Sequence, residues 1–366
     1  MHLFLSQKPN IKNFFSILLA ILPISFIAGN MIININVILI IISCLLIYKK
    51  EVFKIKYLFL DKTIFLFFFV ILFTGIYNDI FFIVTDAFPK GYNTILKSFF
   101  FLKYLLLYLI FRFLTEKKLI TLKIFFISCF LCSVFVSLDI FYQFFNGKDI
   151  FGFETIGSGR RLAGPFGDEE IAGGYLQRFS IFSFFLLPLF FYHQSVKYSK
   201  YLIPILFFIF FSGIILSGNR MPMILFIFTT LLILIFQKQT RKYLIPFILI
   251  FLIIFTSVFN LNSEVKNNFN NFYKQINKMI VIAVNRDFQN KNSPQYLKEF
   301  STFYDTWLIN KYIGGGIKNF RYYCHIRKNI DKNSKFICNM HPHNYYLEIL
   351  TETGIIGFSI IILIFI

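Results

Sequence analysis

The sequence is poor in charged residues. They make up 15% of its 366 residues and hydrophobic residues make up 57%, whereas soluble domains contain roughly 25% charged residues. So few polar groups cannot cover the apolar surface of a soluble protein of this size. The sequence also lacks a clear small-x-small cleavage site after its first apolar stretch, so we expect no cleaved signal peptide. The composition therefore excludes a soluble globular protein.

What the sequence has instead is a series of apolar runs long enough to cross a membrane core of ~30 Å. In lipid the backbone must satisfy its own hydrogen bonds, so we expect helices although the runs are rich in Ile and Phe. The predicted fold is all-α, a polytopic transmembrane helix bundle. Its roughly ten spans are Ile11–Ala28, Met31–Tyr48, Thr63–Tyr77, Ile95–Leu114, Leu119–Phe145, Ile171–Tyr192, Tyr201–Leu216, Met221–Phe236, Tyr243–Phe259 and a last one from Tyr345 to Ile366.

Lys and Arg follow the even-numbered spans. They are dense in 49–62 and in 112–123, whereas 30–36 has none. The positive-inside rule therefore predicts a cytoplasmic N-terminus and places the long segment after the ninth span outside. Cytoplasmic anchors account for much of the net charge of +19, so we expect no nucleic-acid partner.

This orientation predicts three regions. Residues 1–259 form a nine-helix membrane region, 260–342 form one large outer loop, and 343–366 form a helix that enters the tenth span. The apolar run is still continuing at Ile366, without a polar flank.

Two arginine-containing segments interrupt the apolar pattern on the predicted outer side. The first includes Arg160 and Arg161, whose guanidinium groups suit phosphate; a solvated loop in which arginines pair with nearby carboxylates is the alternative. The second places Arg220 in a very short connection. An arginine there can simply snorkel, but snorkelling normally favours the cytoplasmic side, so a functional role is expected.

The outer loop contains Cys324 and Cys338. A zinc site made of Cys324, His325, Cys338 and His341 is one interpretation. An oxidising compartment favours a disulfide between the two cysteines, which would stabilise the loop by roughly 3 kcal/mol. We expect the disulfide and no metal site. The cysteines within predicted spans are expected to be small core residues: Cys44, Cys129 and Cys132.

The loop ends in His341-Pro342-His343-Asn344, at the start of the last span. A histidine there can be idle at the interface, but histidine is also suited to act as a general base near neutral pH. His341 and His343 are two residues apart, so they do not lie on one helical face and by themselves are a poor pair of metal ligands.

Charged residues also occur within the predicted spans. Glu348 and Glu352 are four apart on one helical face, and Lys97 and Lys103 lie in the fourth span. Charges are costly in a membrane, so partners or a function are expected. Snorkelling is the alternative for Lys97, near the outer end, while Lys103 is expected to face the bundle interior.

Several motifs together resemble the O-antigen ligase and O-antigen polymerase superfamily. The most specific is His343-Asn344, followed after nine residues by Gly354-x-x-Gly357. Further similar motifs are Gly314-Gly315-Gly316 leading to Phe320-Arg321, Arg161-x-x-Gly164-Pro165-Phe166, and Ser217-Gly218-Asn219-Arg220. Two residues depart from the family's pattern. Asn219 stands where Ser or Thr is common, and Phe358 follows the second glycine where ligases often have Thr. The given sequence stops at Ile366, before the family's terminal spans, so we expect either a fragment or an unusually abrupt end.

The resemblance implies a metal-independent, inverting glycosyltransferase without cofactors. It would act on an undecaprenyl-diphosphate-linked glycan at the periplasmic face of a bacterial inner membrane. The implied acceptor is lipid A–core or a second lipid-linked glycan. The large loop at 260–342 would then be periplasmic and 343–366 would carry the catalytic motif.

The resemblance also implies roles for individual residues. His343 would be the base, and Arg220 and Arg161 would hold the diphosphate. The further candidates for substrate binding are Arg160, Arg321, His341, Asn344 and Glu352. Three other functions remain open on the sequence: a transporter or flippase of glycan lipids, a protein O-oligosaccharyltransferase, and a purely structural membrane protein.

Overall fold

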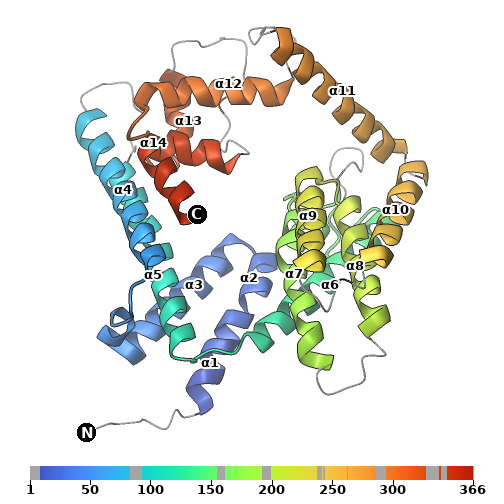
Figure 1. Ribbon diagram of the computed structural model, residues 1–366, viewed down its shortest axis with the longest axis horizontal. Helices are drawn as coiled ribbons and strands as arrows, with labels where there is room; N and C mark the ends of the chain where they lie inside the picture. Colours follow the sequence, from blue (N-terminus) through green and yellow to red (C-terminus); the bar gives the residue numbers. More distant parts are fainter. Residues whose placement is uncertain are drawn as a thin grey trace. The chain divides into compact units, whose positions relative to one another are not determined.

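The computed structural model (Figure 1) describes residues 9–82, 93–154, 161–191, 199–236, 241, 244–261, 263–285, 294–326, 338 and 344–365. In these residues the chain is helical, with no strand and a single isolated bridge between Lys148 and Glu154. This confirms the predicted all-α fold. The principal helices are α1 (Pro9–Ala20), α2 (Leu22–Ala28), α3 (Asn30–Tyr48), α4 (Phe59–Phe82), α5 (Thr94–Glu116), α6 (Leu122–Asn146), α7 (Ala172–Phe191), α8 (Ser199–Leu216), α9 (Arg220–Phe236), α10 (Leu244–Leu261), α11 (Ser263–Asn285), α12 (Gln295–Trp307), α13 (Phe320–Tyr323) and α14 (Tyr345–Phe365).

Each of the ten predicted spans falls on a helix. The first is divided into α1 and α2, with Pro23 near the start of α2, because proline cannot donate to the preceding turn. Within the described residues, six stretches are long and apolar enough to cross a membrane, and α8, α9 and α10 contain shorter apolar segments. The chain is a multi-pass membrane protein.

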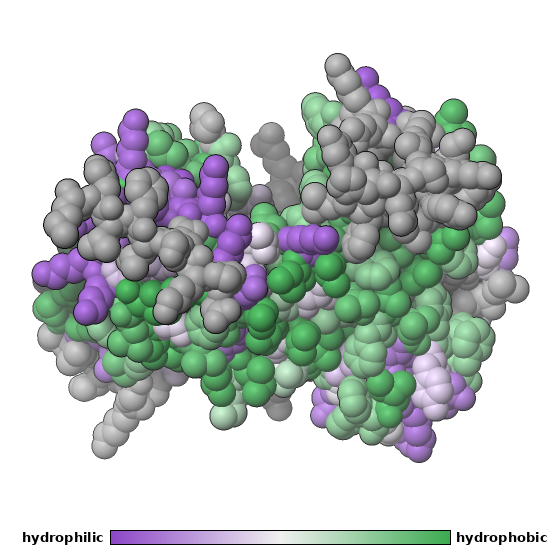
Figure 2. All heavy atoms as spheres, turned by 90° about the horizontal axis from the view of Figure 1, so that it is seen from below, coloured by the Kyte–Doolittle hydropathy of each residue, from purple (hydrophilic) through white to green (hydrophobic). Residues whose placement is uncertain are grey.

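Large apolar side chains also cover much of the surface. Phe69 on α4 is 64% exposed, and Phe99 and Phe100 on α5 are exposed to a similar degree. Figure 2 shows one face on which hydrophobic side chains are widespread. Such a surface is unfavourable in water and is the surface that spans present to lipid.

The chain divides into two compact units. The first comprises Met1–Ile47 and Leu114–Asn270, and the second comprises Tyr48–Phe113 and Asn271–Ile366. In the first unit, α6 packs against α1, α7 and α8. Its core is rich in phenylalanine: Phe207 stacks on Phe211 and on Phe226, with ring centroids 5.2 and 5.7 Å apart. Cys129 and Cys132 lie in this core as free thiols, as expected, and Cys44 is likewise buried.

In the second unit, α14 packs against α4 and α12. At one end of α4, the carboxylate of Asp79 accepts hydrogen bonds from the backbone N–H groups of Thr94 and Ile95, at 2.9 and 2.8 Å. These are orphan donors of the first turn of α5, so Asp79 caps α5 from the neighbouring helix.

At the other end of α4, Asp61 is buried and binds α5. Its carboxylate receives two hydrogen bonds from Arg112, at 3.1 and 3.2 Å, and one from the Tyr108 hydroxyl. It also accepts the backbone N–H of Leu58 at 2.6 Å, just before α4 begins. The ion pair therefore joins the two helices and fixes the start of α4.

We predict that Asp61→Asn destabilises the second unit by about 1.5–3 kcal/mol, the usual worth of a hydrogen bond to a charged group. Thermal unfolding of the purified protein in lipid nanodiscs measures this. The control is Glu154→Gln, because the Lys148–Glu154 pair is largely exposed and such pairs contribute little. Equal stability of the two variants would contradict the assigned role of Asp61.

Candidate functional site

The last helix is interrupted at its motif. Gly354 lies within α14 and has φ +63° and ψ −170°, a backbone conformation that is essentially restricted to glycine. In a continuous helix the N–H groups of Ile355 and Ile356 would donate to the carbonyls of Thr351 and Glu352. The break leaves these four backbone groups without their helical partners.

The glycine-rich segment supplies the missing partners. The N–H groups of Gly315 and Gly316 donate to the carbonyls of Thr351 and Glu352, both at 2.8 Å. In return, Ile355 and Ile356 donate to the carbonyls of Lys311 and Tyr312, at 2.9 and 3.3 Å. Residues 311–316 thus provide partners for all four backbone groups, with four hydrogen bonds in place of the two that a continuous helix would have there. We call this arrangement the glycine clamp.

The clamp requires glycine for two reasons. Gly314 and Gly316 have φ of +81° and +88°, in the region that favours glycine. The backbones also approach closely: a Cβ on Gly314 would meet the backbone of Glu352, Thr353 and Gly354, and one on Gly315 would lie 2.8 Å from the ring of Tyr323. The sequence motifs Gly314-Gly315-Gly316 and Gly354-x-x-Gly357 therefore form one structural element.

Buried side chains hold the clamp against α4 and the loop. Thr74 and Asn78 of α4 donate to the carbonyls of Ile313 and Gly314, at 3.1 and 3.0 Å. Asn319 donates to the carbonyl of Gly315 at 3.0 Å. Asn78 also accepts a hydrogen bond from the Tyr323 hydroxyl. Sequence analysis missed Thr74 and Asn78, although a polar Asn78-Asp79 pair at the end of a predicted span is an available signal.

The charged residues of the spans join the same network. The carboxylate of Glu352 is buried and accepts the backbone N–H of Lys318 at 2.6 Å. The ammonium group of Lys97 donates to Asn319 Oδ1 at 2.7 Å. Lys97 and Arg321 both lie against the ring of Tyr322, 4.8 and 5.5 Å from its centroid. The expectation that these charges have partners is therefore correct for Lys97 and Glu352.

The cations and carboxylates here also interact electrostatically over longer range. Lys97 experiences the charges of Arg321, Lys318, Asp79 and Glu352. Arg321, a predicted substrate ligand, thus belongs to a polar cluster that includes two further cations. Lys103, in contrast, lies over the ring of Tyr104, 5.1 Å from its centroid, and is half-buried.

The start of α14 is capped by Asn344. Its side-chain Oδ1 accepts the backbone N–H groups of Tyr346 and Leu347, at 3.0 and 3.2 Å, which is the usual role of an N-cap asparagine. The predicted ligand Asn344 therefore has a structural role. His343, immediately before it in the chain, and His341 lie outside the described residues, as does Arg160.

A disulfide joins Cys324 to Cys338, so the structure has the pairing that the sequence favoured over a zinc site. Cys324 is buried against Phe303 and Phe320, and Cys338 and Leu347 pack on the same cluster. The disulfide therefore attaches Cys338, seven residues before the first residue of α14, to the α12–α13 region. His325 is exposed.

The first unit brings two of the predicted arginine segments together. Arg161 forms an ion pair with Glu170 at 2.6 Å, and the backbone carbonyl of Glu170 accepts a hydrogen bond from Asn219 at 3.1 Å. Gly173 permits this contact, because a Cβ there would lie 2.9 Å from that of Asn219. Arg220 is half-buried at the first position of α9. The ion pair of Arg161 with Glu170 is the contact expected if this segment is a solvated loop whose arginines pair with nearby carboxylates.

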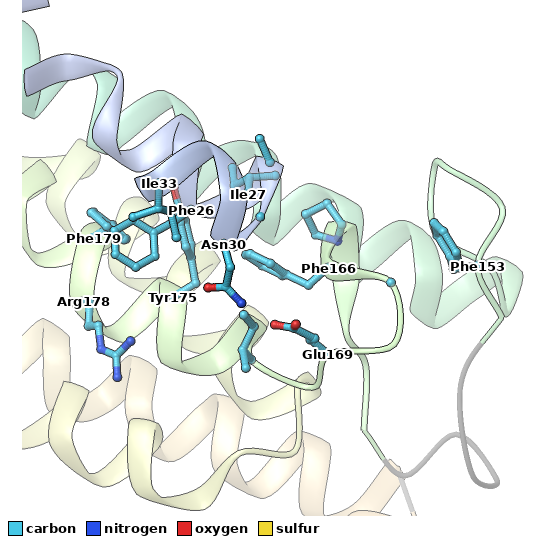
Figure 3. Close-up of a pocket in the computed structure, with 15 residues that line it drawn as sticks. Phe26, Ile27, Asn30, Ile33, Phe153, Phe166, Glu169, Tyr175, Arg178 and Phe179 are labelled. Atoms are coloured by element: carbon cyan, nitrogen blue, oxygen red, sulfur yellow. The ribbon is translucent and has the colours of Figure 1, made fainter. Parts of the chain in front are cut away.

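A cavity of about 440 Å³ lies beside the same loop. Figure 3 shows the rings of Phe26, Tyr175 and Phe179 on one side, with Asn30 and Glu169 nearer to Phe166. Arg178 also lines the cavity. An apolar wall with a few polar groups is typical of ligand sites. Sequence analysis missed this cavity because its lining residues come from α2, α3, α7 and the loop between α6 and α7.

Comparison with protein families matches residues 205–362 to the O-Antigen ligase family. The match runs from within α8 to within α14 and includes Arg220, the glycine clamp, the disulfide and the His343-Asn344 motif. It does not include Arg160 or Arg161. A search of curated proteins found no match.

We predict that Gly354→Ala destabilises the protein by at least about 1–3 kcal/mol, the cost of a strained backbone conformation, since its Cβ would also lie 2.6 Å from the N atom of Ile313. Gly174→Ala is the control: Gly174 is helical and a Cβ there meets no atom within 4 Å, so helix propensity should make this change neutral or slightly stabilising. Thermal unfolding in nanodiscs compares the two. A Gly354→Ala protein as stable as wild type would show that the break in α14 is absent.

Proposed function

We propose, from the premise that residues 205–362 match the O-antigen ligase family, that this chain transfers a lipid-carried glycan as an O-antigen ligase or polymerase. Its donor would be an undecaprenyl-diphosphate-linked oligo- or polysaccharide, and its acceptor lipid A–core or a second lipid-linked glycan. The site would lie at the periplasmic face of the inner membrane, with the N-terminus in the cytoplasm. The multi-pass fold supports this proposal, because such a donor is held in the bilayer by its polyprenyl tail.

In the proposed reaction, an acceptor hydroxyl attacks the anomeric carbon of the glycan. The new glycosidic bond forms as the bond between that carbon and the diphosphate breaks, with inversion of configuration. The hydroxyl proton passes to His343, and the lipid diphosphate leaves as an anion. The reaction therefore needs a base and cations, and no metal ion is required.

The arginines meet the second need. Arg220 and Arg161 would bind the diphosphate, with Arg160 and Arg321 as additional cations; a guanidinium group presents five N–H donors in a geometry that suits phosphate oxygens. The ion pair with Glu170 engages Nη1 of Arg161 and orients the group. Such fixed charges stabilise a leaving anion most strongly where water is scarce.

The glycine clamp is the observation that best supports the assignment of His343. Both halves of the motif that resembles the family, His343-Asn344 and Gly354-x-x-Gly357, lie at or next to fixed points of α14: its capped start and its clamped break. A catalytic base must be held within a fraction of an ångström of its working position. In this proposal, the clamp and the cap serve that purpose, and His341 contributes to the binding of substrate. Asn344 and Glu352, the other predicted ligands near this motif, instead position the backbone through their contacts at the start of α14 and at Lys318.

The charged groups within the spans bear on the transporter alternative. A transport pathway needs charges that face a cavity. Lys97 and Glu352 instead bind Asn319 and the backbone of Lys318, so their contacts support a structural role. A protein O-oligosaccharyltransferase would use the same donor and differ only in its acceptor, a Ser or Thr hydroxyl.

We predict that His343→Ala lowers the transfer rate about 10²–10⁴-fold, the usual contribution of a general base. The assay is a lipopolysaccharide gel of the host strain lacking this protein, complemented with each variant. His325→Ala is the matched control, because His325 is exposed in the same loop region, and it should restore the wild-type pattern.

The same gel distinguishes the acceptors. Loss of all capped lipopolysaccharide, with accumulation of long lipid-linked chains, indicates a ligase; single-repeat caps without a ladder indicate a polymerase. An unchanged gel in the strain lacking the protein points to another glycan or a protein acceptor. Where the strain lacking the protein shows a changed gel, full complementation by His343→Ala would refute the base assignment for a ligase and for a polymerase alike.

We also predict that Arg220→Gln abolishes most transfer while Arg241→Gln does not. Arg220 begins α9, and Arg241 donates to the carbonyl of Ile235 in its last turn, at 2.7 Å. The two changes thus remove one positive charge near opposite ends of the same helix. Purified variants assayed with a lipid-diphosphate glycan should show the difference, and equal activity would argue against a diphosphate contact at Arg220.

A further inference from the structure

Helix α11 has an apolar face that the described structure leaves exposed. Tyr273, Ile276, Ile280 and Val284 follow one another at intervals of three or four residues, which places them on one side of the helix. Tyr273 is 66% exposed, Ile280 55% and Val284 75%. A row of large apolar side chains facing water is unfavourable, so this face is expected to be covered.

The next helix shows what a covered face looks like. α12 is also amphipathic, but its Phe303 is 2% exposed and stacks on Phe320, with ring centroids 4.1 Å apart. An amphipathic pattern in this region is therefore compatible with burial of large apolar side chains. α11 differs from α12 because its apolar row contacts no comparable cluster in the described part of the chain.

The opposite face of α11 carries lysines, and near the end of the helix it also carries the buried Ile282. Lys274 and Lys278 project about 160° away from Ile276 and Ile280 on a helical wheel of 100° per residue, and both lysines are exposed. Lys266 adds a third exposed cation. Three lysines over 23 residues make the helix too polar to be a span, and α11 is not one of the stretches that qualify.

The position of α11 in the chain indicates what covers it. α10, which contains the apolar segment Ile245–Ser257, ends at Leu261, and α11 begins at Ser263; the two follow one another in Figure 1. α11 therefore starts where a lipid-facing helix leaves the membrane core. A helix with one apolar face and a lysine-rich polar face is suited to lie in the membrane interface, where lysines attract anionic headgroups.

We propose that α11 lies in the plane of the membrane interface, with Tyr273, Ile276, Ile280 and Val284 inserted among the lipids. Twenty-three residues of helix extend about 35 Å, so the following outer segment would be carried along the membrane surface. The partner is a lipid surface with anionic headgroups. This inference goes beyond the proposed glycan transfer and does not depend on it.

The single tryptophan of the chain, Trp307, makes a direct test possible. In a Trp307→Phe background, Ile280→Trp and Lys278→Trp place one fluorophore on each face of α11. The full chain is reconstituted in vesicles of phosphatidylcholine and phosphatidylglycerol whose acyl chains carry bromine. We expect the fluorescence of Ile280→Trp to be quenched mostly by the brominated lipid. The fluorescence of Lys278→Trp should be quenched mostly by acrylamide added to the aqueous phase.

Two results would overturn the proposal. Strong acrylamide quenching at both positions would mean that the apolar face is in water. Quenching of Ile280→Trp by neither reagent would mean that protein covers it, either another segment or a second copy of the chain. Should a variant fail to fold, as judged by its helical circular dichroism, Ile276→Trp and Lys274→Trp form an equivalent pair on the same two faces.

Discussion

The constraint on which the second unit depends is that no backbone polar group can be left unpaired away from water. α14 is broken at Gly354, and each unpaired group in lipid costs several kcal/mol. The glycine-rich segment answers this with four backbone hydrogen bonds. Thr74, Asn78 and Asn319 then hold that segment in place. Lys97 and Glu352 bind the residues that directly follow it, Asn319 and Lys318. Lys97 and Glu352 would each carry a free-energy cost if they were unpaired within a span. The segment that binds the break in α14 leads directly to the residues that pair with them.

This arrangement connects the fold to the proposed chemistry. A glycosyl transfer at a membrane surface needs a base and cations held at a fixed depth. The clamp and the Asn344 cap fix α14 at two points, directly after the histidine motif in the chain. In the other unit, the close approach at Gly173 brings the Arg161–Glu170 pair to the segment that ends in Arg220. In both units, glycine permits a close contact beside the charged residues of the proposed site: with backbone at Gly314 and with side chains at Gly173.

The sequence was sufficient to predict the helices but not their interruptions. Long apolar runs predicted a helix at each of the ten positions, because a bilayer permits little else, and six of the described stretches are long and apolar enough to cross a membrane. The break at Gly354 was missed: Gly354-x-x-Gly357 was treated as a motif, and its partner, Gly314–Gly316, lies some forty residues earlier in the chain. α11 and α12 were missed within the predicted loop, although their amphipathic patterns are readable. The cap at Asn344 could have been inferred, since Asn commonly precedes a helix. The Arg161–Glu170 pair could be anticipated only as one of two alternatives, because pairing depends on tertiary contacts.

Amide hydrogen exchange of the full chain in nanodiscs tests the clamp most directly. If the account is correct, the amides of Gly315, Gly316, Ile355 and Ile356 exchange slowly in wild type. Gly314→Ala accelerates all four together, because all four hydrogen bonds join the same two backbone segments. Unprotected amides at 315–316 beside a protected 355–356, or acceleration of one pair alone in Gly314→Ala, would show that α14 is a continuous helix and that the glycine clamp does not form.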